Sequence, residues 1–292
     1  MSTPEETRKS FAEGDAIRDA GLTTPENIIR HDDLSYGIHG KWNLMDIYHL
    51  KGVEGCQKTI VNVHGGGWVY GTKEVYQFYC MSLAQRGFTV VNFNYRLAPE
   101  DPFPAAIEDI NALFTWIADH GHEHHIDTKN LFAVGDSAGA QLLSQYLAML
   151  TNSEFQKLYD LLIPSDRIRI NAAALNCGVY DMRAWTDQSL DGVLEAYIGE
   201  RREEVLSKID TMKYVTSDFP PSFVMTSYCD FLKENARPMY EHLKSLGVPC
   251  EYRIYGAEDR EDVAHVFHCN MRLPEAKECN DEECRFFEQY IR

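Results

Sequence analysis

No stretch of about 18 apolar residues occurs in the 292-residue chain, although 44% of its residues are hydrophobic. A helix needs about 20 mostly apolar residues to cross a bilayer, so the sequence predicts no membrane span. Residues 1–19 also lack the apolar centre of a secretory signal. We therefore expect a cytoplasmic protein.

Basic residues are too few to balance the acidic ones. The chain has 28 Lys and Arg residues against 45 Asp and Glu residues, which gives a formal net charge of −17. No local basic patch interrupts this excess of negative charge. Because such a surface repels nucleic acid and anionic lipids alike, we expect neither nucleic acid nor a membrane among the partners.

The cysteines lack the regular spacing of a disulfide framework. The eight are scattered along the chain: Cys56, Cys80, Cys177, Cys229, Cys250, Cys269, Cys279 and Cys284. In the absence of an export signal, free thiols in a reducing compartment are the better interpretation.

Short β-rich runs alternate with longer helical patterns along most of the chain. The runs expected to be buried strands are residues 59–63, 88–93, 131–134, 170–175 and 223–227. We expect antiparallel strands at the start of the sheet over residues 34–38 and 44–50, and a far edge strand over 251–255. The expected helices are residues 75–86, 105–120, 138–150, 231–246 and 281–291. This alternation predicts an α/β fold with a mostly parallel sheet covered by helices.

Two parts of the chain fall outside this alternation. The first 30 residues have the pattern of a polar, amphipathic helix, and residues 178–221 form a mixed stretch between two expected strands. An insertion at that point lies over the carboxyl ends of the strands, where such sheets bind ligands. We interpret residues 1–292 as a single domain with a cap assembled from about residues 1–30 and 178–221.

The strongest motif is Gly-Asp-Ser-Ala-Gly at residues 135–139. It follows the apolar run 131–134 and opens a helix at Ala138, which is the context in which G-x-S-x-G forms a nucleophile elbow. Small neighbours permit the strained turn that exposes the serine hydroxyl. The alternative is a glycine-rich turn with a helix-capping serine. We identify Ser137 as the candidate nucleophile.

Three successive glycines lie in the run His-Gly-Gly-Gly-Trp at residues 64–68, directly after the expected strand 59–63. Glycines cost conformational entropy on folding, so three together at a strand end call for a reason. An oxyanion hole supplies one, because its backbone N–H groups must reach the substrate carbonyl without side chains in the way. The alternative is a flexible surface turn. We expect His64 to hold this loop by hydrogen bonds rather than to act as a base.

A nucleophilic serine needs a base, and after a nucleophile elbow the chain order is serine, acid, histidine. Three histidines follow Ser137: His242, His265 and His268. His242 falls inside a helical pattern. The other two lie in residues 258–269, where a loop can reach back over the serine. Spacing favours His265 as the base, with His268 as the alternative.

The orienting carboxylate is expected at the carboxyl end of a strand. Asp230 comes just after the expected strand 223–227 and precedes a helix, although an aspartate there also serves as a helix N-cap. Asp259 and Asp262 are competitors, but they are close in sequence to His265 and are expected to be solvated. We take Asp230 as the candidate acid.

Two clusters invite a metal-binding interpretation. One comprises four closely spaced histidines beside Glu123: His120, His122, His124 and His125. Its spacing follows no zinc pattern, and histidines are favourable where a helix ends. The pair Cys279 and Cys284 lacks a matching second pair. We expect no metal and no cofactor.

Four motifs occur together, in the order and approximate spacing of one family. They are HGGGW, NYRLAPE at residues 94–100, PFPAA at residues 102–106, and GDSAG. From about residue 44 to residue 267 the chain resembles the hormone-sensitive-lipase family of esterases. The resemblance implies an α/β-hydrolase fold with an eight-stranded, mostly parallel sheet and a small helical cap. It also implies ester hydrolysis without a cofactor or metal.

The resemblance also implies roles for single residues. Ser137 takes the position of the nucleophile, Asp230 matches the acid of the family's D-x-L motif, and His265 matches the histidine of its H-G-F motif. Valine stands at position 266 where the family usually has glycine.

For the oxyanion hole, the resemblance implies backbone N–H groups from Gly66, Gly67 and Ala138. Ala140 and Gln141 replace the usual Gly-Asn pair after the elbow. None of these departures removes a catalytic group. Aromatic residues of the expected cap are candidates for either the pocket wall or the core: Tyr180, Trp185 and Tyr197.

The sequence therefore predicts a carboxylesterase that hydrolyses small, short-chain acyl esters through an acyl-enzyme. One alternative is an amidase or small-peptide hydrolase that uses the same triad. The other is a non-catalytic, ligand-binding member of the fold, against which the presence of His265 argues. The expected edge strand, residues 251–255, could also pair two subunits into a homodimer.

Overall fold

The computed structural model describes residues 2–182, 191–200 and 202–292. Its centre is one eight-stranded sheet in the order β1-β2-β4-β3-β5-β6-β7-β8. The strands are β1 (Ile28–Ser35), β2 (Leu44–Leu50), β3 (Gln57–Val63), β4 (Thr89–Phe93), β5 (Ile126–Asp136), β6 (Ala172–Asn176), β7 (Ser222–Ser227) and β8 (Cys250–Tyr255). Among the described strands, β2 runs opposite to the others and is therefore antiparallel to both of its neighbours, β1 and β4. The predicted mostly parallel, eight-stranded sheet is confirmed.

The inner strands of the sheet are buried on both faces, which explains why they read as continuous apolar runs. In β5, Leu131 and Ala133 face one core, whereas Phe132 and Val134 face the other. The same alternation recurs along the neighbouring parallel strands. Helices must therefore cover both faces.

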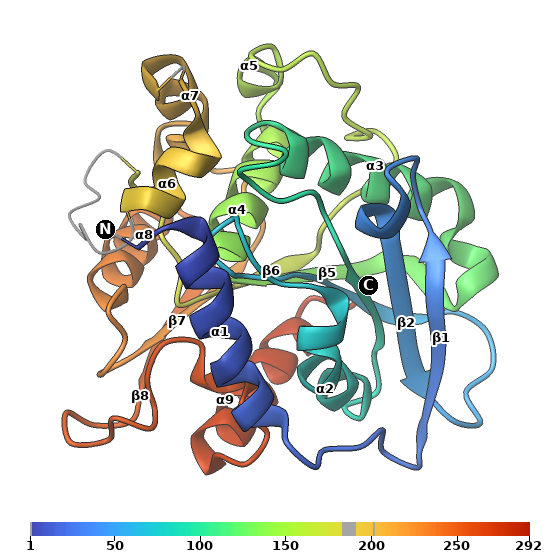
Figure 1. Cartoon of the computed structure of the whole chain (residues 1–292). Helices are drawn as coiled ribbons and strands as arrows, with labels where there is room; N and C mark the ends of the chain where they lie inside the picture. The colour runs from blue at the N-terminus through green and yellow to red at the C-terminus, as the bar shows by residue number, and fades with distance from the viewer. Residues whose placement is uncertain (1, 183–190, 201) are drawn as a thin grey trace.

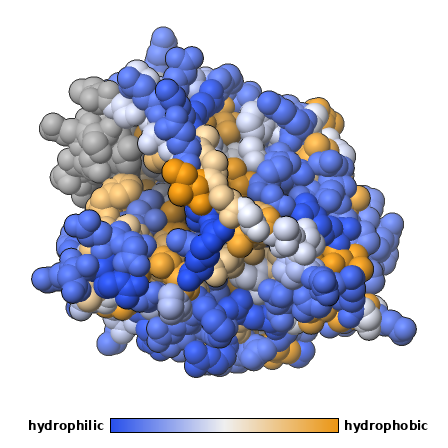
Figure 2. All heavy atoms as spheres, turned by 60° about the horizontal axis from the view of Figure 1, so that its bottom comes forward, coloured by the Kyte–Doolittle hydropathy of each residue, from blue (hydrophilic) through white to orange (hydrophobic). Residues whose placement is uncertain are grey.

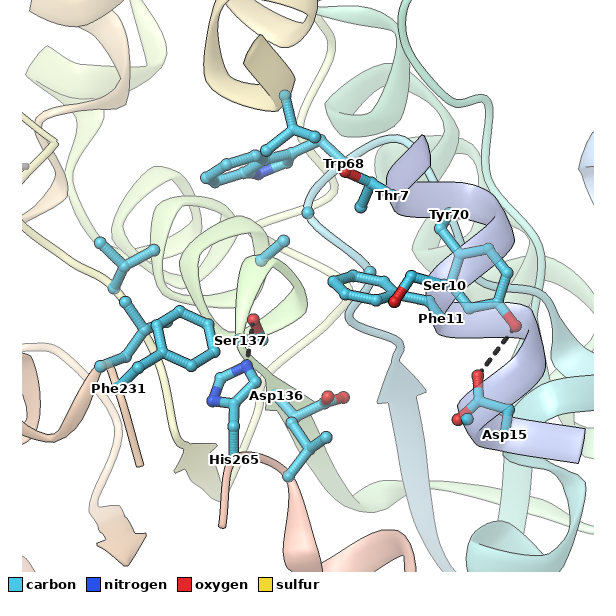
Figure 3. A pocket seen from close by; sticks show the side chains of 18 of the residues that line it. Thr7, Ser10, Phe11, Asp15, Trp68, Tyr70, Asp136, Ser137, Phe231 and His265 are labelled. Atoms are coloured by element: carbon cyan, nitrogen blue, oxygen red, sulfur yellow. Dashed lines mark hydrogen bonds between the residues drawn. The ribbon is translucent and has the colours of Figure 1, made fainter. Parts of the chain in front are cut away.

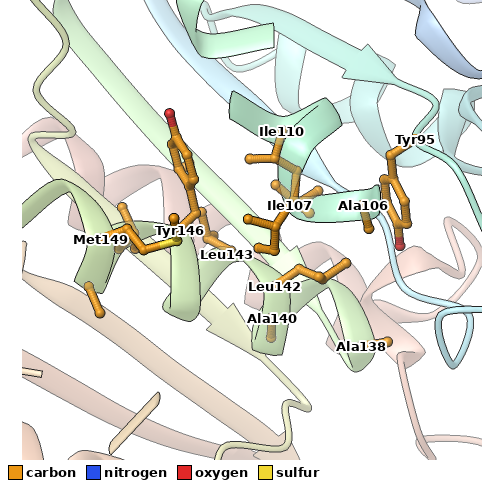
Figure 4. Packing of buried hydrophobic residues seen from close by; sticks show 14 of the residues in the cluster. Tyr95, Ala106, Ile107, Ile110, Ala138, Ala140, Leu142, Leu143, Tyr146 and Met149 are labelled. Carbon is orange, nitrogen blue, oxygen red and sulfur yellow. The ribbon is translucent and has the colours of Figure 1, made fainter. Parts of the chain in front are cut away.

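Helices flank the sheet on either side (Figure 1). Helices α3 (Ala105–His120), α4 (Ala138–Thr151) and α8 (Lys233–Ser245) contribute to the larger core, and Figure 4 shows α3 and α4 packed together there. Helices α2 (Lys73–Ala84) and α9 (Pro274–Glu288) contribute to the core on the opposite face. Short elements connect the others: α5 (Ser153–Gln156), η1 (Gly40–Asn43), η2 (Gly121–His124), η4 (Thr211–Lys213) and η5 (Phe267–Cys269).

Three predicted boundaries are wrong by five residues or more, and one of them is the start of β5, which lies at Ile126 rather than residue 131. The first strand is Ile28–Ser35 rather than residues 34–38, because its polar side chains hide the strand pattern. The last helix begins at Pro274, seven residues before the predicted start at position 281. Its first turns carry many charged residues, and the proline fits the first helical position.

The two segments that fall outside the alternation of strands and helices, about residues 1–30 and 178–221, contact each other through their helices. Helix α1 (Pro4–Asp19) runs across the molecule and contacts α6 (Asp191–Ile198), which in turn contacts α7 (Arg202–Ile209). Part of the predicted cap, including Trp185, lies outside the described residues. The other two aromatic candidates, Tyr180 and Tyr197, are fully buried.

Hydrophilic residues dominate the face of the molecule shown in Figure 2, with smaller apolar groups towards its middle. Within the described ranges, no helix has both the length and the apolar character that a membrane crossing requires. All eight cysteines are free thiols.

Candidate active site

Ser137 occupies the sharp turn between β5 and α4. Its backbone has φ 54° and ψ −122°, a conformation that L-residues rarely adopt. The Ser137 N–H donates to the carbonyl oxygen of Asn176 (2.9 Å), which ties the turn to the neighbouring strand β6. The side chain is thereby held at the carboxyl end of the sheet, at the start of a helix.

Glycine at position 139 is required by the close approach of another strand. A Cβ atom there would lie 2.1 Å from the carbonyl oxygen of Val63 and 2.4 Å from that of His64. Helix α4 can therefore begin close to the end of β3 only with glycine at this position. This contact is the physical reason for the final glycine of the motif.

The structure brings Ser137, His265 and Asp230 together. His265 Nε2 lies 2.9 Å from Ser137 Oγ, and His265 Nδ1 lies 2.7 Å from Asp230 Oδ1 (Figure 3 shows the first contact). Because a carboxylate only accepts hydrogen bonds, Nδ1 carries a proton and Nε2 is free to accept the serine hydroxyl proton.

Asp230 is fully buried but well supplied with donors. Its carboxylate accepts from the Leu232 N–H (2.8 Å) and the Thr226 hydroxyl (2.8 Å) as well as from His265. Burial by itself raises the pKa of Asp230, but the charge of His265 and these hydrogen bonds outweigh it and leave the pKa lowered. The carboxylate therefore stays ionised at neutral pH.

The competing candidates lie elsewhere. His268 is buried with its ring edge-on to Tyr79, at 5.0 Å between centroids. Asp259 and Asp262 are exposed, and Asp262 pairs with Arg260 (2.8 Å). None of these three lines the cavity beside Ser137.

The glycine loop after β3 is fixed by a buried network. The Gly65 N–H donates to Asp136 Oδ1 (3.0 Å) and to the Tyr76 hydroxyl oxygen (3.0 Å), and the Tyr76 hydroxyl donates to Asp136 Oδ2 (2.7 Å). Burial raises the pKa of Asp136 to about 6. The buried His64 holds the same loop through Nδ1, 2.8 Å from the Gly65 carbonyl oxygen, and its own carbonyl accepts from Tyr95 (2.7 Å).

Gly66 and Gly67 follow in left-handed backbone conformations, with φ 118° and 58°. A Cβ atom on Gly66 would lie 2.1 Å from the carbonyl oxygen of Tyr70. Ala138 begins α4, so its N–H has no acceptor within the helix. All three residues line the same cavity as Ser137 and His265.

The cavity has a volume of about 320 Å³. Figure 3 shows Phe231 next to His265 on one side and Phe11 of α1 facing from the other. The Phe231 ring lies 4.3 Å from the His265 ring between centroids. Val193 of α6 also contributes to the wall.

Sequence reasoning did not single out the α1 residues of the wall. They are Thr7, Ser10, Phe11, Gly14, Asp15 and Arg18. Their spacing of three and four residues places them on one helical face, which is the signal that could have found them. Tyr197 is not a lining residue but stacks on Trp68, at 5.0 Å between ring centroids.

Comparisons with known proteins identify the family of the chain. A family model described as alpha/beta hydrolase fold matches residues 60–269, so the chain belongs to that family. An acetyl esterase of Salmonella choleraesuis (strain SC-B67) is 27% identical over 248 residues, which cover 79% of this chain and 72% of the relative.

Solved esterases share the fold. Esterase B from Lactobacillus rhamnosis (HN001) has a TM-score of 0.88 at 24% identity and covers 98% of this chain and 93% of its own. A second structure of that esterase involves inhibition by a C4-C4 SN3 tributyrin phosphonate. An esterase from the bacterial hormone-sensitive lipase family has a TM-score of 0.78 at 21% identity, with coverage of 100% and 93%.

These findings confirm the predicted α/β-hydrolase fold and the resemblance to the hormone-sensitive-lipase family of esterases. They also confirm the predicted class of enzyme, a serine hydrolase of carboxylic esters.

Proposed function

We propose that this protein is a short-chain carboxylesterase that works through an acyl-enzyme on Ser137. The observation that carries the proposal is the hydrogen-bonded chain from Ser137 through His265 to Asp230 at the floor of a small cavity. A nucleophile in contact with a base, and a base oriented by a carboxylate, is the arrangement that activates a serine hydroxyl.

The reaction begins when Ser137 Oγ attacks the ester carbonyl carbon and His265 Nε2 accepts the hydroxyl proton. The N–H groups of Gly66, Gly67 and Ala138 stabilise the negative charge that develops on the carbonyl oxygen. When the intermediate collapses, the bond to the alcohol breaks and the alcohol leaves with the proton from His265. Water then attacks the acyl group by the same route and restores Ser137.

Asp230 acts through His265 rather than on the substrate. Its lowered pKa keeps it charged, so it fixes the proton on Nδ1 and stabilises the imidazolium that forms at each transfer. The Phe231 ring beside His265 shields this pair from water on one side.

The cavity size supports a small acyl group. A volume of about 320 Å³ is near the lower end of the roughly 300–1,000 Å³ of small-molecule sites. Phe11 and Val193 limit the space available to a long chain. The activity named for the Salmonella relative, acetyl ester hydrolysis, fits this size.

The test compares kcat/KM for p-nitrophenyl acetate, butyrate and octanoate, and for the matched anilide p-nitroacetanilide. We expect the octanoate value to fall about tenfold or more below the best short ester, which corresponds to about 1.4 kcal/mol of lost transition-state binding. An anilide rate above the ester rate would assign the site to an amidase. Absence of turnover on all four would favour the ligand-binding alternative.

Three further expectations belong to this proposal. The chain is a single domain whose cap comprises α1 and the segment that carries α6 and α7, and it acts in the cytoplasm.

Two copies pair through β8, which lies at the end of the sheet. Light scattering coupled to size exclusion checks the dimer, and an Ile254→Pro variant should be monomeric because proline cannot donate to a new ladder.

A further inference from the structure

Three histidines from separate parts of the chain meet at the end of the sheet away from Ser137. His31 lies on β1, His49 lies near the end of β2, and His125 immediately precedes β5. One ring nitrogen of each lies within 4.8 Å of the others. Ser137 follows the opposite end of β5, which has 11 residues and so spans at most about 36 Å at about 3.3 Å per residue. The cluster is therefore separate from the proposed catalytic site.

The pairing of β1 with β2 places His31 and His49 on one face of the sheet. Ile29 lies opposite His49 and Ile47 opposite His31, so the two histidines are diagonal neighbours. Their Nε2 atoms are 3.1 Å apart. The nitrogens of two ligands on a tetrahedral metal ion, each about 2.1 Å from it, are separated by about 3.4 Å.

Backbone carbonyls fix the tautomers of two of the rings. His49 Nδ1 lies 3.0 Å from the Leu50 carbonyl oxygen, and His125 Nδ1 lies 3.0 Å from that of Gly55. A carbonyl can only accept, so both Nδ1 atoms carry protons and both Nε2 atoms of the neutral rings present lone pairs. Histidine ligands of metals are commonly held by this kind of outer contact.

The three rings differ in their exposure to solvent. His49 is buried, His125 is half-buried and His31 is exposed, so the cluster is open to solvent on one side.

We propose that His31, His49 and His125 form a binding site for a divalent transition-metal ion such as Zn²⁺. Imidazole nitrogen is a preferred ligand of zinc, copper and nickel, and three protein ligands leave a fourth position for water. On binding, the hydrogen bond between His31 and His49 is replaced by two metal–nitrogen bonds. The proton on that bond moves to Nδ1 of His31, which keeps the ring neutral while its Nε2 binds the metal.

His125 reaches the cluster because of its own backbone conformation. It has φ 62° at the end of η2, and its carbonyl oxygen accepts from the Gln57 N–H (2.9 Å) and the Thr89 hydroxyl (3.0 Å). These bonds fix the turn at the start of β5. A bound ion would tie this turn to the β1–β2 edge and so stabilise that end of the sheet.

The experiment titrates the full-length, chelator-treated protein with ZnCl₂ in a calorimeter. We expect the wild type to bind one Zn²⁺ per chain. His31→Ala and His125→Asn should each weaken binding by about tenfold or more, as loss of metal-site contacts does. Asparagine is chosen at position 125 because it tolerates a positive φ. Co²⁺ provides a second readout, since a three-histidine site gives it a visible absorption spectrum that the variants should lack.

His122→Asn is the matched control, because His122 is an exposed histidine of the same turn that does not belong to the cluster. This control should bind Zn²⁺ like the wild type, and Zn²⁺ should raise the Tm of both. All variants should keep wild-type hydrolysis of p-nitrophenyl acetate, which verifies folding. No binding by the wild type, or an equal loss in His122→Asn, would overturn the proposal.

Discussion

The surroundings of Asp230 determine how the proposed base is oriented. The carboxylate accepts from the Thr226 hydroxyl and the Leu232 N–H as well as from His265. The Leu232 N–H and the Thr226 hydroxyl hold the carboxyl plane, so the His265 ring is fixed from behind while its Nε2 remains available to Ser137. A change at this residue should therefore affect catalysis much more than folding.

Asp230→Asn tests this role. Asparagine keeps the shape but no longer favours the Nδ1–H tautomer of His265, so kcat on p-nitrophenyl acetate should fall by about 10⁴-fold. The Tm should change little. Asp262→Asn is the control, since Asp262 is an exposed acid near His265 in sequence. Similar losses in the two variants would contradict the assignment of Asp230.

Gly66 and Gly67 provide a matched pair of variants, because both remove a glycine from the loop but only one should distort the oxyanion hole. Gly66→Ala places Cβ against the Tyr70 carbonyl oxygen and must move the loop, so kcat should fall by about a hundredfold or more. At Gly67 the nearest atom to a new Cβ is Val193 Cγ2, at 3.6 Å. The φ of 58° at Gly67 makes an alanine there costly for stability. With no backbone atom in the way, Gly67→Ala should still lose much less activity when kcat is compared at equal folded fraction. The reverse order would mean that this loop does not form the oxyanion hole.

At this scale the sequence predicted the residues whose surroundings are local. Ser137 was recognisable because its strand, turn and helix are consecutive in the chain. Residues that depend on distant partners were harder to predict. The pairing of Gly65 with Asp136 and Tyr76 joins three segments. Phe231 stands at the variable position of the D-x-L motif, which does not specify its side chain.

Among the described helices and strands, α1 contributes the largest number of residues to the cavity wall. Arg8 binds it to the loops below through the carbonyl oxygens of Val69 (2.7 Å) and Ala98 (2.9 Å). Near its other end, Arg18 donates to the Val75 carbonyl oxygen (2.9 Å). These contacts position Phe11 over the proposed acyl site.

Phe11→Ala should enlarge that site. The ratio of kcat/KM for p-nitrophenyl octanoate to that for the acetate should rise about tenfold, because fitting or excluding a methylene is worth about 1–3 kcal/mol. Ile17→Ala is the control on the same helix, since Ile17 is 78% exposed. If both variants keep the wild-type ratio, Phe11 does not set the acyl length.

Elements were predictable where burial imposed a pattern. Strands β3 to β7 lie in the middle of the sheet and read as apolar runs. Strand β1 lies at an edge with charged side chains exposed, so its limits were missed. The sequence assigned α1 and the segment with α6 to one cap, but the residues through which they touch depend on tertiary contacts that no local pattern encodes.

For the whole molecule, buried histidines connect stability to pH. Burial, with the charges of His265 and Arg18, lowers the pKa of His268 from 6.5 to about 3. Between these values the unfolded chain binds a proton that the folded chain does not. The contribution of neutral His268 to the free energy of unfolding is therefore fully present above about pH 6.5. It is lost as the pH falls towards 3. Burial raises the pKa of Glu283 to about 7, so the folded chain keeps a proton that the unfolded chain has lost. This group therefore lowers the free energy of unfolding as the pH rises towards 7.

His268→Phe isolates the histidine contribution from these opposing groups. Between about pH 6.5 and pH 4.5 the wild type should lose about 2 kcal/mol more unfolding free energy than the variant. Urea denaturation of both proteins at several pH values measures this difference. Parallel pH profiles would show that His268 is not held neutral in the folded protein.

The histidine cluster shows where sequence reasoning reaches its limit at this scale. Four histidines at residues 120–125 are neighbours in the chain and invited a metal-binding interpretation, but their spacing matches no zinc motif. The fold instead brings only His125 of that group to His31 and His49, which are 94 and 76 positions away in the sequence. Proximity of this kind follows from strand order, which short-range patterns do not determine.

The most direct test of the central claim is to find the acyl group. The wild type, Ser137→Ala and Ser10→Ala are mixed with p-nitrophenyl acetate, stopped with acid during turnover and mapped by peptide mass spectrometry. The account predicts one acetyl group on Ser137 in the wild type and in Ser10→Ala, whose altered serine also lines the cavity. It predicts none in Ser137→Ala, with kcat reduced by about 10⁶-fold. Acetylation at another residue, or retained turnover in Ser137→Ala, would contradict it.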